Sequence, residues 1–461
     1  MSSMLVRFVR LLGAGLLVVP VVGWSQSSSN LPPLPEDLVP ALRPILVTAL
    51  GQSPQMIAQN INITQAEAIR IQNTANMWPS VSGSVNYTSS DTAVSSSISS
   101  SNSGVFYSLS VYQPIYHWGA LKARADSGKI GVKIAEHNYA EAYRLLVVNL
   151  RTQFLGLVAK KIALRNAAYA LKQAEEALAL AQEKLKAGRI SSEEIMEPNL
   201  AVDEARLARD RAQADLDGSL RLLLLTVGQA DLAVADIPEG VPQPAYDPEV
   251  AARLLQEFKR TGAEETYQAL VYRDYIRQAD LDYRIARVNL LPKFSFGATA
   301  SQQNYTNASV NYISQVAIDS NSWNIQASWS IFDGFATRGA KLSALTRKRT
   351  YERALRTTAG QAIAQAESLS RQLDFAWRYL QLRQTRRDIS ETQFKRAEDN
   401  LKLGQTSQTA VNAAELAFYS SELTLTTARG DFLNGWSQYL STLCADPMLS
   451  QVPAGYLKDG K

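Results

Sequence analysis

Side chains that could bind a metal or carry out catalysis are few in this sequence of 461 residues. Cys444 is the single cysteine, which excludes an internal disulfide bond and a metal site built from several thiolates. The two histidines, His117 and His137, are twenty positions apart and lack neighbours with the spacing of known zinc ligands. We therefore expect no metal, no cofactor and no catalytic site, and we interpret both histidines as surface or packing residues.

Three carboxylates are the remaining candidates for chemistry, and they follow Gly188 within ten positions: Glu193, Glu194 and Glu197. Acidic side chains are favourable near the start of a helix because of the helix dipole. Solvated helix ends therefore explain these residues as well as a functional role does. The basic clusters at 347–349 and 383–387 are likewise explained by solvated or salt-bridged helix faces.

The charge balance excludes one class of partner. Lys and Arg number 47 against 43 Asp and Glu, so the formal net charge is only +4. A nucleic-acid partner usually requires a clear basic surplus, and none is present. We expect no nucleic-acid binding.

The N-terminal residues have the pattern of a secretory signal peptide. Arg7 and Arg10 precede an apolar stretch, Leu11–Val22, and small residues follow it. We predict a signal peptide at residues 1–25 and an N-terminal extension at 26–44. Beyond residue 25 no stretch is apolar enough to cross a bilayer as a helix, so the exported chain is either soluble or crosses a membrane with strands.

The sequence contains an internal repeat. Leu185-Lys186-Ala187-Gly188 returns 216 positions later as Leu401-Lys402-Leu403-Gly404, and Ile115-Tyr116-His117 returns at the same offset as Ile331-Phe332-Asp333. We predict two repeats of the order helix-strand-strand-helix. Their bounds are 45–236 and 249–447, with a proline-rich linker at 237–248 and a C-terminal tail at 448–461.

Each repeat opens with a helix and continues with two alternating strands. The first helix begins near Leu46 and ends before Pro79, which cannot continue it. Alternation of apolar and polar residues predicts strands at 81–88, 105–112, 294–301 and 323–331. The polar stretches Ser89–Ser103 and Asn304–Asn321 are expected to be exposed loops.

Two very long helices follow the strands. Ala120–Lys186 and Thr337–Lys402 contain no proline and are rich in good helix formers, so each should reach about 100 Å. Each should break at its glycine, Gly188 or Gly404, and return as a second helix at 192–227 or 408–443 after Ser191 or Ser407 as N-cap.

Four strands are too few to close a membrane barrel, since the smallest known have about eight. Unpaired strand edges in lipid are costly, so the strands would have to be shared between chains. Two copies would give eight strands and three would give twelve. A soluble sheet in an exported protein is the alternative.

These features resemble the TolC family of outer-membrane efflux channels over residues 45–447. The resemblance rests on Trp78-Pro79 and Leu291-Pro292 before the strands, on the corner at 113–119 echoed at 329–334, and on the repeated Leu-Lys-x-Gly turn. It implies an α+β membrane protein: a homotrimer with a shared 12-stranded β-barrel in outer-membrane lipid and a long antiparallel α-helical coiled-coil tunnel in the periplasm of a Gram-negative-type bacterium. The linker 237–248 would lie in an equatorial region.

The resemblance also implies a passive channel-tunnel for efflux or type I secretion, which works with a periplasmic adaptor (membrane fusion) protein and an energised inner-membrane transporter. A non-transporting periplasmic or surface coiled-coil scaffold is the alternative function. By analogy, the adaptor-docking tip candidates are Lys186, Gly188, Arg189, Lys402, Gly404 and Gln405.

The same analogy places a periplasmic aperture beside these turns, with candidates Glu193, Glu194, Glu197, Thr406 and Ala410. Glu194 stands six positions after Gly188, where some relatives carry an acid. The second repeat departs from this pattern, because Ala410 occupies the matching position and Thr406 stands where some relatives have a basic residue. In a trimer, the three glutamates would form rings of negative charge that favour cations.

Overall fold

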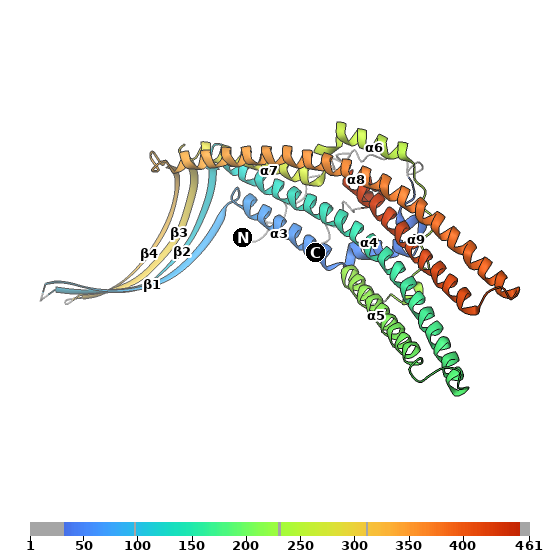
Figure 1. Ribbon diagram of the computed structural model, residues 1–461. Helices are drawn as coiled ribbons and strands as arrows, with labels where there is room; N and C mark the ends of the chain where they lie inside the picture. Colours follow the sequence, from blue (N-terminus) through green and yellow to red (C-terminus); the bar gives the residue numbers. More distant parts are fainter. Residues whose placement is uncertain (1–31, 96–97, 229–231, 310–311, 452–461) are drawn as a thin grey trace, which may run out of the picture. The chain divides into compact units, whose positions relative to one another are not determined.

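The computed structural model describes residues 32–95, 98–228, 232–309 and 312–451, so the predicted signal peptide and the last ten residues of the predicted tail lie outside the described residues. Its helices and strands follow one another along the chain as Figure 1 shows. They are α1 (Pro35–Leu38), α2 (Leu42–Gln52), α3 (Pro54–Ala75), β1 (Ser80–Ser95), β2 (Ile98–Tyr116), α4 (Ala120–Lys186), α5 (Met196–Val227), α6 (Pro248–Arg260), α7 (Tyr267–Arg287), β3 (Lys293–Ser309), β4 (Tyr312–Ser328), α8 (Ala336–Lys402) and α9 (Gln408–Thr442).

The two long helices are confirmed. Helix α4 has the predicted bounds, and α8 begins one residue before the predicted start; each contains 67 residues. Gly188 and Gly404 end them with φ of 65° and 71°, a left-handed conformation that favours glycine. The return helix α5 begins at Met196 rather than at 192, because residues 192–195 form turns.

The opening helix of the first repeat is interrupted, which the sequence analysis missed. Helix α2 ends at Gln52 and α3 begins at Pro54, with Ser53 between them in an extended conformation. Proline is well suited to the first turn of a helix but restricts the residue before it to extended conformations. The break therefore follows directly from Pro54.

The strands form one antiparallel sheet in the order β1-β2-β3-β4. The expected loops at 89–103 and 304–321 are wrong, because Ser89 pairs with Ser103 and Asn304 pairs with Ala317 within continued strands. Backbone hydrogen bonds of a ladder do not depend on apolar side chains, so polar composition alone did not mark the ends of the strands. Strand β4 also ends earlier than predicted, at Ser328.

The sheet has one apolar and one polar face near the helices. Val85 is paired with Tyr107, and Val81 with Val111, on the apolar face, where Ala298 and Trp323 continue the row of Val111. Serines and threonines occupy the other face and bond across strands: Ser84 Oγ lies 2.8 Å from Ser108 Oγ, and Ser110 Oγ lies 3.2 Å from Thr299 Oγ1. The alternation of side chains along a strand creates this separation.

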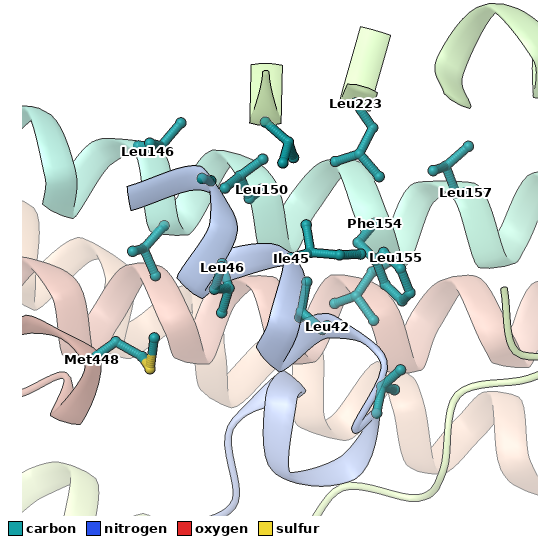
Figure 2. Packing of buried hydrophobic residues seen from close by; sticks show 14 of the residues in the cluster. Leu42, Ile45, Leu46, Leu146, Leu150, Phe154, Leu155, Leu157, Leu223 and Met448 are labelled. Atoms are coloured by element: carbon teal, nitrogen blue, oxygen red, sulfur yellow. The ribbon is translucent and has the colours of Figure 1, made fainter. Parts of the chain in front are cut away.

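The main apolar core surrounds the middle of α4, as Figure 2 shows. Leu146, Leu150 and Phe154 of α4 are almost completely buried there. Their neighbours come from α2, α5, α9 and the C-terminal 3-10 turn (Pro447–Gln451). Segments from both ends of the described chain are therefore held against the same helix.

A buried ionic cluster reinforces this attachment. The Arg151 guanidinium on α4 donates to both carboxylate oxygens of Glu36, at 2.9 and 2.5 Å, and to both carboxylate oxygens of Asp446. All three side chains are at most 2% exposed. Burial acts against the charged guanidinium, but the two carboxylates outweigh it and hold the pKa of Arg151 above its usual value.

Within the described ranges, no helix combines the length and the apolar character that a membrane-spanning helix needs.

Candidate functional site

The two turns that join the long helices have the same backbone geometry. Gly188 N–H donates to the carbonyl oxygen of Leu185 and Arg189 N–H to that of Lys184, both at 2.9 Å. Gly404 and Gln405 repeat this pair of bonds with Leu401 and Asn400 at 2.9 and 2.8 Å. Each turn thus satisfies the carbonyl groups at the end of its helix by itself.

The predicted docking candidates all lie at these turns and are all exposed: Lys186, Gly188, Arg189, Lys402, Gly404 and Gln405. Leu403, which the sequence analysis did not single out, is also 70% exposed. An exposed leucine between Lys402 and Gly404 adds apolar surface to the second turn. Both turns can therefore offer a partner exposed backbone and charged side chains.

Of the three candidate glutamates, Glu193 and Glu194 lie in the turn before α5 and Glu197 lies in its first turn, and all are exposed. Glu194 has a local structural role. Its carboxylate accepts a hydrogen bond from Ser191 N at 2.7 Å, and its own N–H donates to Ser191 Oγ at 3.3 Å. This reciprocal pair resembles a capping box, so Glu194 stabilises the turn in addition to any effect on ions.

The second turn lacks the acidic half of this arrangement. Ser407 Oγ accepts a hydrogen bond from Ala410 N at 3.3 Å, which confirms Ser407 as the N-cap of α9. The alanine side chain cannot return the bond. Thr406 is partly buried beside this cap. The two turns have the same backbone geometry, but only the first is followed by a cluster of carboxylates.

The helix pairs are joined through α4 and α9, a contact that the sequence did not predict. Arg165 of α4 forms an ion pair with Glu422 of α9 at 2.6 Å, and the rings of Tyr169 and Tyr419 meet edge to face at 5.0 Å. Asn166 Nδ2 also donates to the carbonyl oxygen of Tyr419. The packed order is therefore α5, α4, α9, α8, which leaves α5 and α8 as the outer members.

One of the two histidines lies beside a carboxylate. His137 Nε2 lies 3.4 Å from the Asp274 carboxylate, and burial lowers the pKa of His137 although Asp274 acts in the opposite direction. In the part of the chain that the structure describes, no group of three or more His, Cys, Asp or Glu side chains could hold a metal ion.

A sheet with one apolar face, attached to paired helices of about 100 Å, defines a class of protein that crosses a membrane with strands and extends far from it with helices. The chain belongs to the outer membrane efflux protein family, whose model matches residues 45–229 and 271–439. This confirms the resemblance found in the sequence.

Solved structures have the same fold. The Campylobacter jejuni CmeC outer membrane channel is 14% identical with a TM-score of 0.66, covering 88% of this chain and 86% of that one. The Vibrio cholerae outer membrane protein VceC is 15% identical with a TM-score of 0.63, covering 87% and 95%. The open state of the Neisseria gonorrhoeae MtrE outer membrane channel is 13% identical with a TM-score of 0.64, covering 88% and 89%. No curated protein sequence matches the chain.

Family membership and the shared fold establish an efflux channel of the outer membrane, with its helical tunnel in the periplasm. They favour transport over the alternative of a non-transporting scaffold.

Proposed function

We propose that this protein is the passive outer-membrane conduit of an efflux or type I secretion assembly and that it works as a homotrimer. The open sheet is the observation that carries the proposal. Its outer strands, β1 and β4, each pair on one side only within the described chain, and one face of the sheet is apolar. Strand edges in lipid need partners, and three copies of four strands would close a 12-stranded barrel with a lumen.

The apolar face would contact lipid and the serine-rich face would line the lumen. Exposed Tyr87, Trp323 and Ile325 lie on the first of these faces. The helices α4, α5, α8 and α9 would continue the conduit as the tunnel. We keep the division of the chain into two repeats, 45–236 and 249–447. The linker 237–248 would lie between them in an equatorial region.

A periplasmic adaptor would dock at the turns around Gly188 and Gly404, and an inner-membrane transporter would supply the energy. The exposure of all six candidate residues supports this assignment, because each turn bonds its own backbone and leaves these residues accessible to a partner. The conduit itself would carry out no chemistry.

The aperture would be formed at the end of the tunnel where the turns around Gly188 and Gly404 lie. In a trimer, Glu193, Glu194 and Glu197 would each occur three times around one axis, next to the turn that ends α4. Rings of negative charge at a constriction attract cations and repel anions. Thr406 and Ala410 would complete the aperture without adding charge.

Planar-bilayer recordings on the purified full-length protein test the proposal. We expect detergent-dependent trimers on a sizing column and discrete conductance steps with a preference for cations. Changing Glu193, Glu194 and Glu197 together to Gln should weaken that preference. The matched control changes three exposed carboxylates farther along α5, Asp203→Asn, Glu204→Gln and Asp210→Asn, and should have a smaller effect. A monomer without conductance would contradict the conduit, and equal effects of the two triple variants would remove the glutamates from the aperture.

A further inference from the structure

A groove lies where the sheet meets the helices, and it consists of two adjoining hollows. The larger, of about 680 Å³, lies between side chains of α3, α4, α7 and α8. The smaller, of about 310 Å³, extends from there to the ends of β2 and β3. Arg124, Ile285 and Asn289 line both hollows, so the two form one continuous groove.

The groove adjoins the polar face of the sheet. Tyr112 and Lys293 line its smaller hollow. In the register of the sheet, Tyr112 is paired with Gly297, two positions from Thr299, while Lys293 precedes Ser295 by two positions; all of them therefore belong to the serine-rich face. Under the proposed function this face lines the lumen, so a molecule in the conduit would pass the groove.

The charged part of the lining is mainly cationic. Arg124, Lys293 and Arg347 line the groove together with a single carboxylate, Asp282. Arg347 lies 3.3 Å from Asp282, and Lys293 Nζ donates to Asn289 Oδ1 at 3.1 Å. Burial raises the pKa of Asp282, which Arg347 opposes, and this carboxylate already forms its ion pair with Arg347.

Arg124 stands apart from the other two. Among the residues that the structure describes, none forms a hydrogen bond or an ion pair with its guanidinium. It also occupies the wall that the two hollows share. A guanidinium with five free donors is well suited to a carboxylate or sulfonate, which it can bind through two parallel hydrogen bonds.

Apolar side chains also line the groove and would cover a hydrocarbon body. Leu121 and Val288 line the smaller hollow, Ala286 and Ala344 the larger, and Ile285 both. Sites for small organic molecules combine apolar surface with polar groups that fix the orientation of the ligand.

We propose that this groove is a binding site for organic monoanions, with Arg124 holding a carboxylate or sulfonate group and the apolar wall covering an aryl or alkyl body. The site rests on the proposed function only for its position inside the conduit. It adds a cargo class to that function: amphiphilic anions, which the groove binds in transit. A dissolved anion is favoured over a lipid headgroup because the groove adjoins the polar and not the apolar face of the sheet.

Equilibrium dialysis of the full-length protein in an uncharged detergent tests the site directly, with naphthalene-1-sulfonate as the probe. Arg124→Gln should weaken binding about tenfold, the effect of losing one charge-assisted contact. Lys122→Gln is the matched control, since Lys122 is exposed two positions away on the same helix and does not line the groove. Arg124→Lys, which keeps the charge but not the paired donors, should fall between the wild type and Arg124→Gln.

Unchanged affinity in Arg124→Gln would overturn the proposal, and so would equal losses in Arg124→Gln and Lys122→Gln, which would indicate attraction by net charge alone. Equally tight binding of the uncharged naphthalene-1-sulfonamide would also overturn it. Competition by phosphatidylglycerol added to the micelles, without competition by phosphatidylcholine, would reassign the groove to a lipid headgroup. Dialysis requires no conduction, so failure of the site and failure of the channel give different results.

Discussion

At the scale of single residues, Arg151 has the largest structural role that sequence reasoning missed. It links α4 to Glu36 near the start of the described chain and to Asp446 after α9. An arginine at this position of a long amphipathic helix is normally expected to be solvated. Only the arrival of two carboxylates from distant segments makes its burial possible, because an unpaired buried charge would cost several kcal/mol.

Arg151→Met should therefore destabilise the protein by about 3–5 kcal/mol, because it leaves two carboxylates buried without a partner. The triple variant Glu36→Gln, Arg151→Met and Asp446→Asn should recover most of this loss, since no charge then remains buried. Thermal unfolding followed by circular dichroism in detergent would measure both variants. A triple variant no more stable than Arg151→Met would show that packing, and not charge pairing, holds the terminal segments.

At the scale of elements, the corners between strand and long helix share an unusual backbone. Trp118 and Gly119 have φ of 52° and 81°, and Gly334 and Phe335 have φ of 63° and 68° at the corresponding positions of the second repeat. Each corner thus has two consecutive left-handed residues, one of them glycine. The other residue of each pair is aromatic and has a contact of its own. Trp118 Nε1 donates to the carbonyl oxygen of Pro292 at 2.7 Å, and Phe335 packs edge to face on Phe332 at 5.4 Å.

A glycine in the turn at the end of a helix and a glycine in the interior of a helix should respond to substitution by alanine in opposite ways. Gly404→Ala should destabilise its turn by about 1–2 kcal/mol, because an alanine at a φ of 71° is strained although its Cβ would meet no other atom. Gly360→Ala, in the exposed interior of α8 and equally free of contacts, should stabilise the helix by about 0.5–1 kcal/mol. Thermal unfolding of the two variants in parallel would test this, and a shift of both in the same direction would contradict it.

At the scale of the whole molecule, the helix order leaves two apolar stripes without partners in the described chain. Helix α8 exposes Phe375, Leu382 and Ile389 at intervals of seven residues, and α5 exposes Leu200 and Leu207 at the same interval and Leu222 fifteen positions later. A seven-residue repeat is the spacing of a coiled-coil seam. Because α5 and α8 are the outer members of the order α5, α4, α9, α8, closure of a ring would bring α5 of one copy against α8 of the next.

Cysteine cross-linking can test this seam in a Cys444→Ser background. Leu207 and Leu382 are each at least 60% exposed and lie at similar distances from their turns. A short thiol-reactive cross-linker should therefore join chains that carry both Leu207→Cys and Leu382→Cys into dimers and trimers. The mismatched pair Leu200→Cys and Phe375→Cys lies 12 and 29 residues from Gly188 and Gly404, a difference of more than one helical turn, and should not react. Equal cross-linking of both pairs, or of the single variants, would contradict the expected register.

The sequence by itself determined the elements whose causes are local. The bounds of α4 follow from a long proline-free run of helix formers that ends at a glycine, and the repeat at an offset of 216 placed the second turn once the first was found. The turn residues and the glutamates after Gly188 are exposed, as positions at helix ends predict, and their roles, which come from the family resemblance, stay predictions. The serine-rich strand ends were missed, because pairing with a neighbouring strand, and not composition, keeps Ser89–Ser103 extended.

Only the tertiary structure decided which segments meet. The burial of Arg151, the packing of α4 on α9 and the position of Arg124 in its groove all depend on contacts between residues far apart in the chain. Periodicity indicates that a helix has an apolar face but not which helix covers it, because the hydrophobic effect is not directional. The long-range partners were therefore beyond the reach of local patterns.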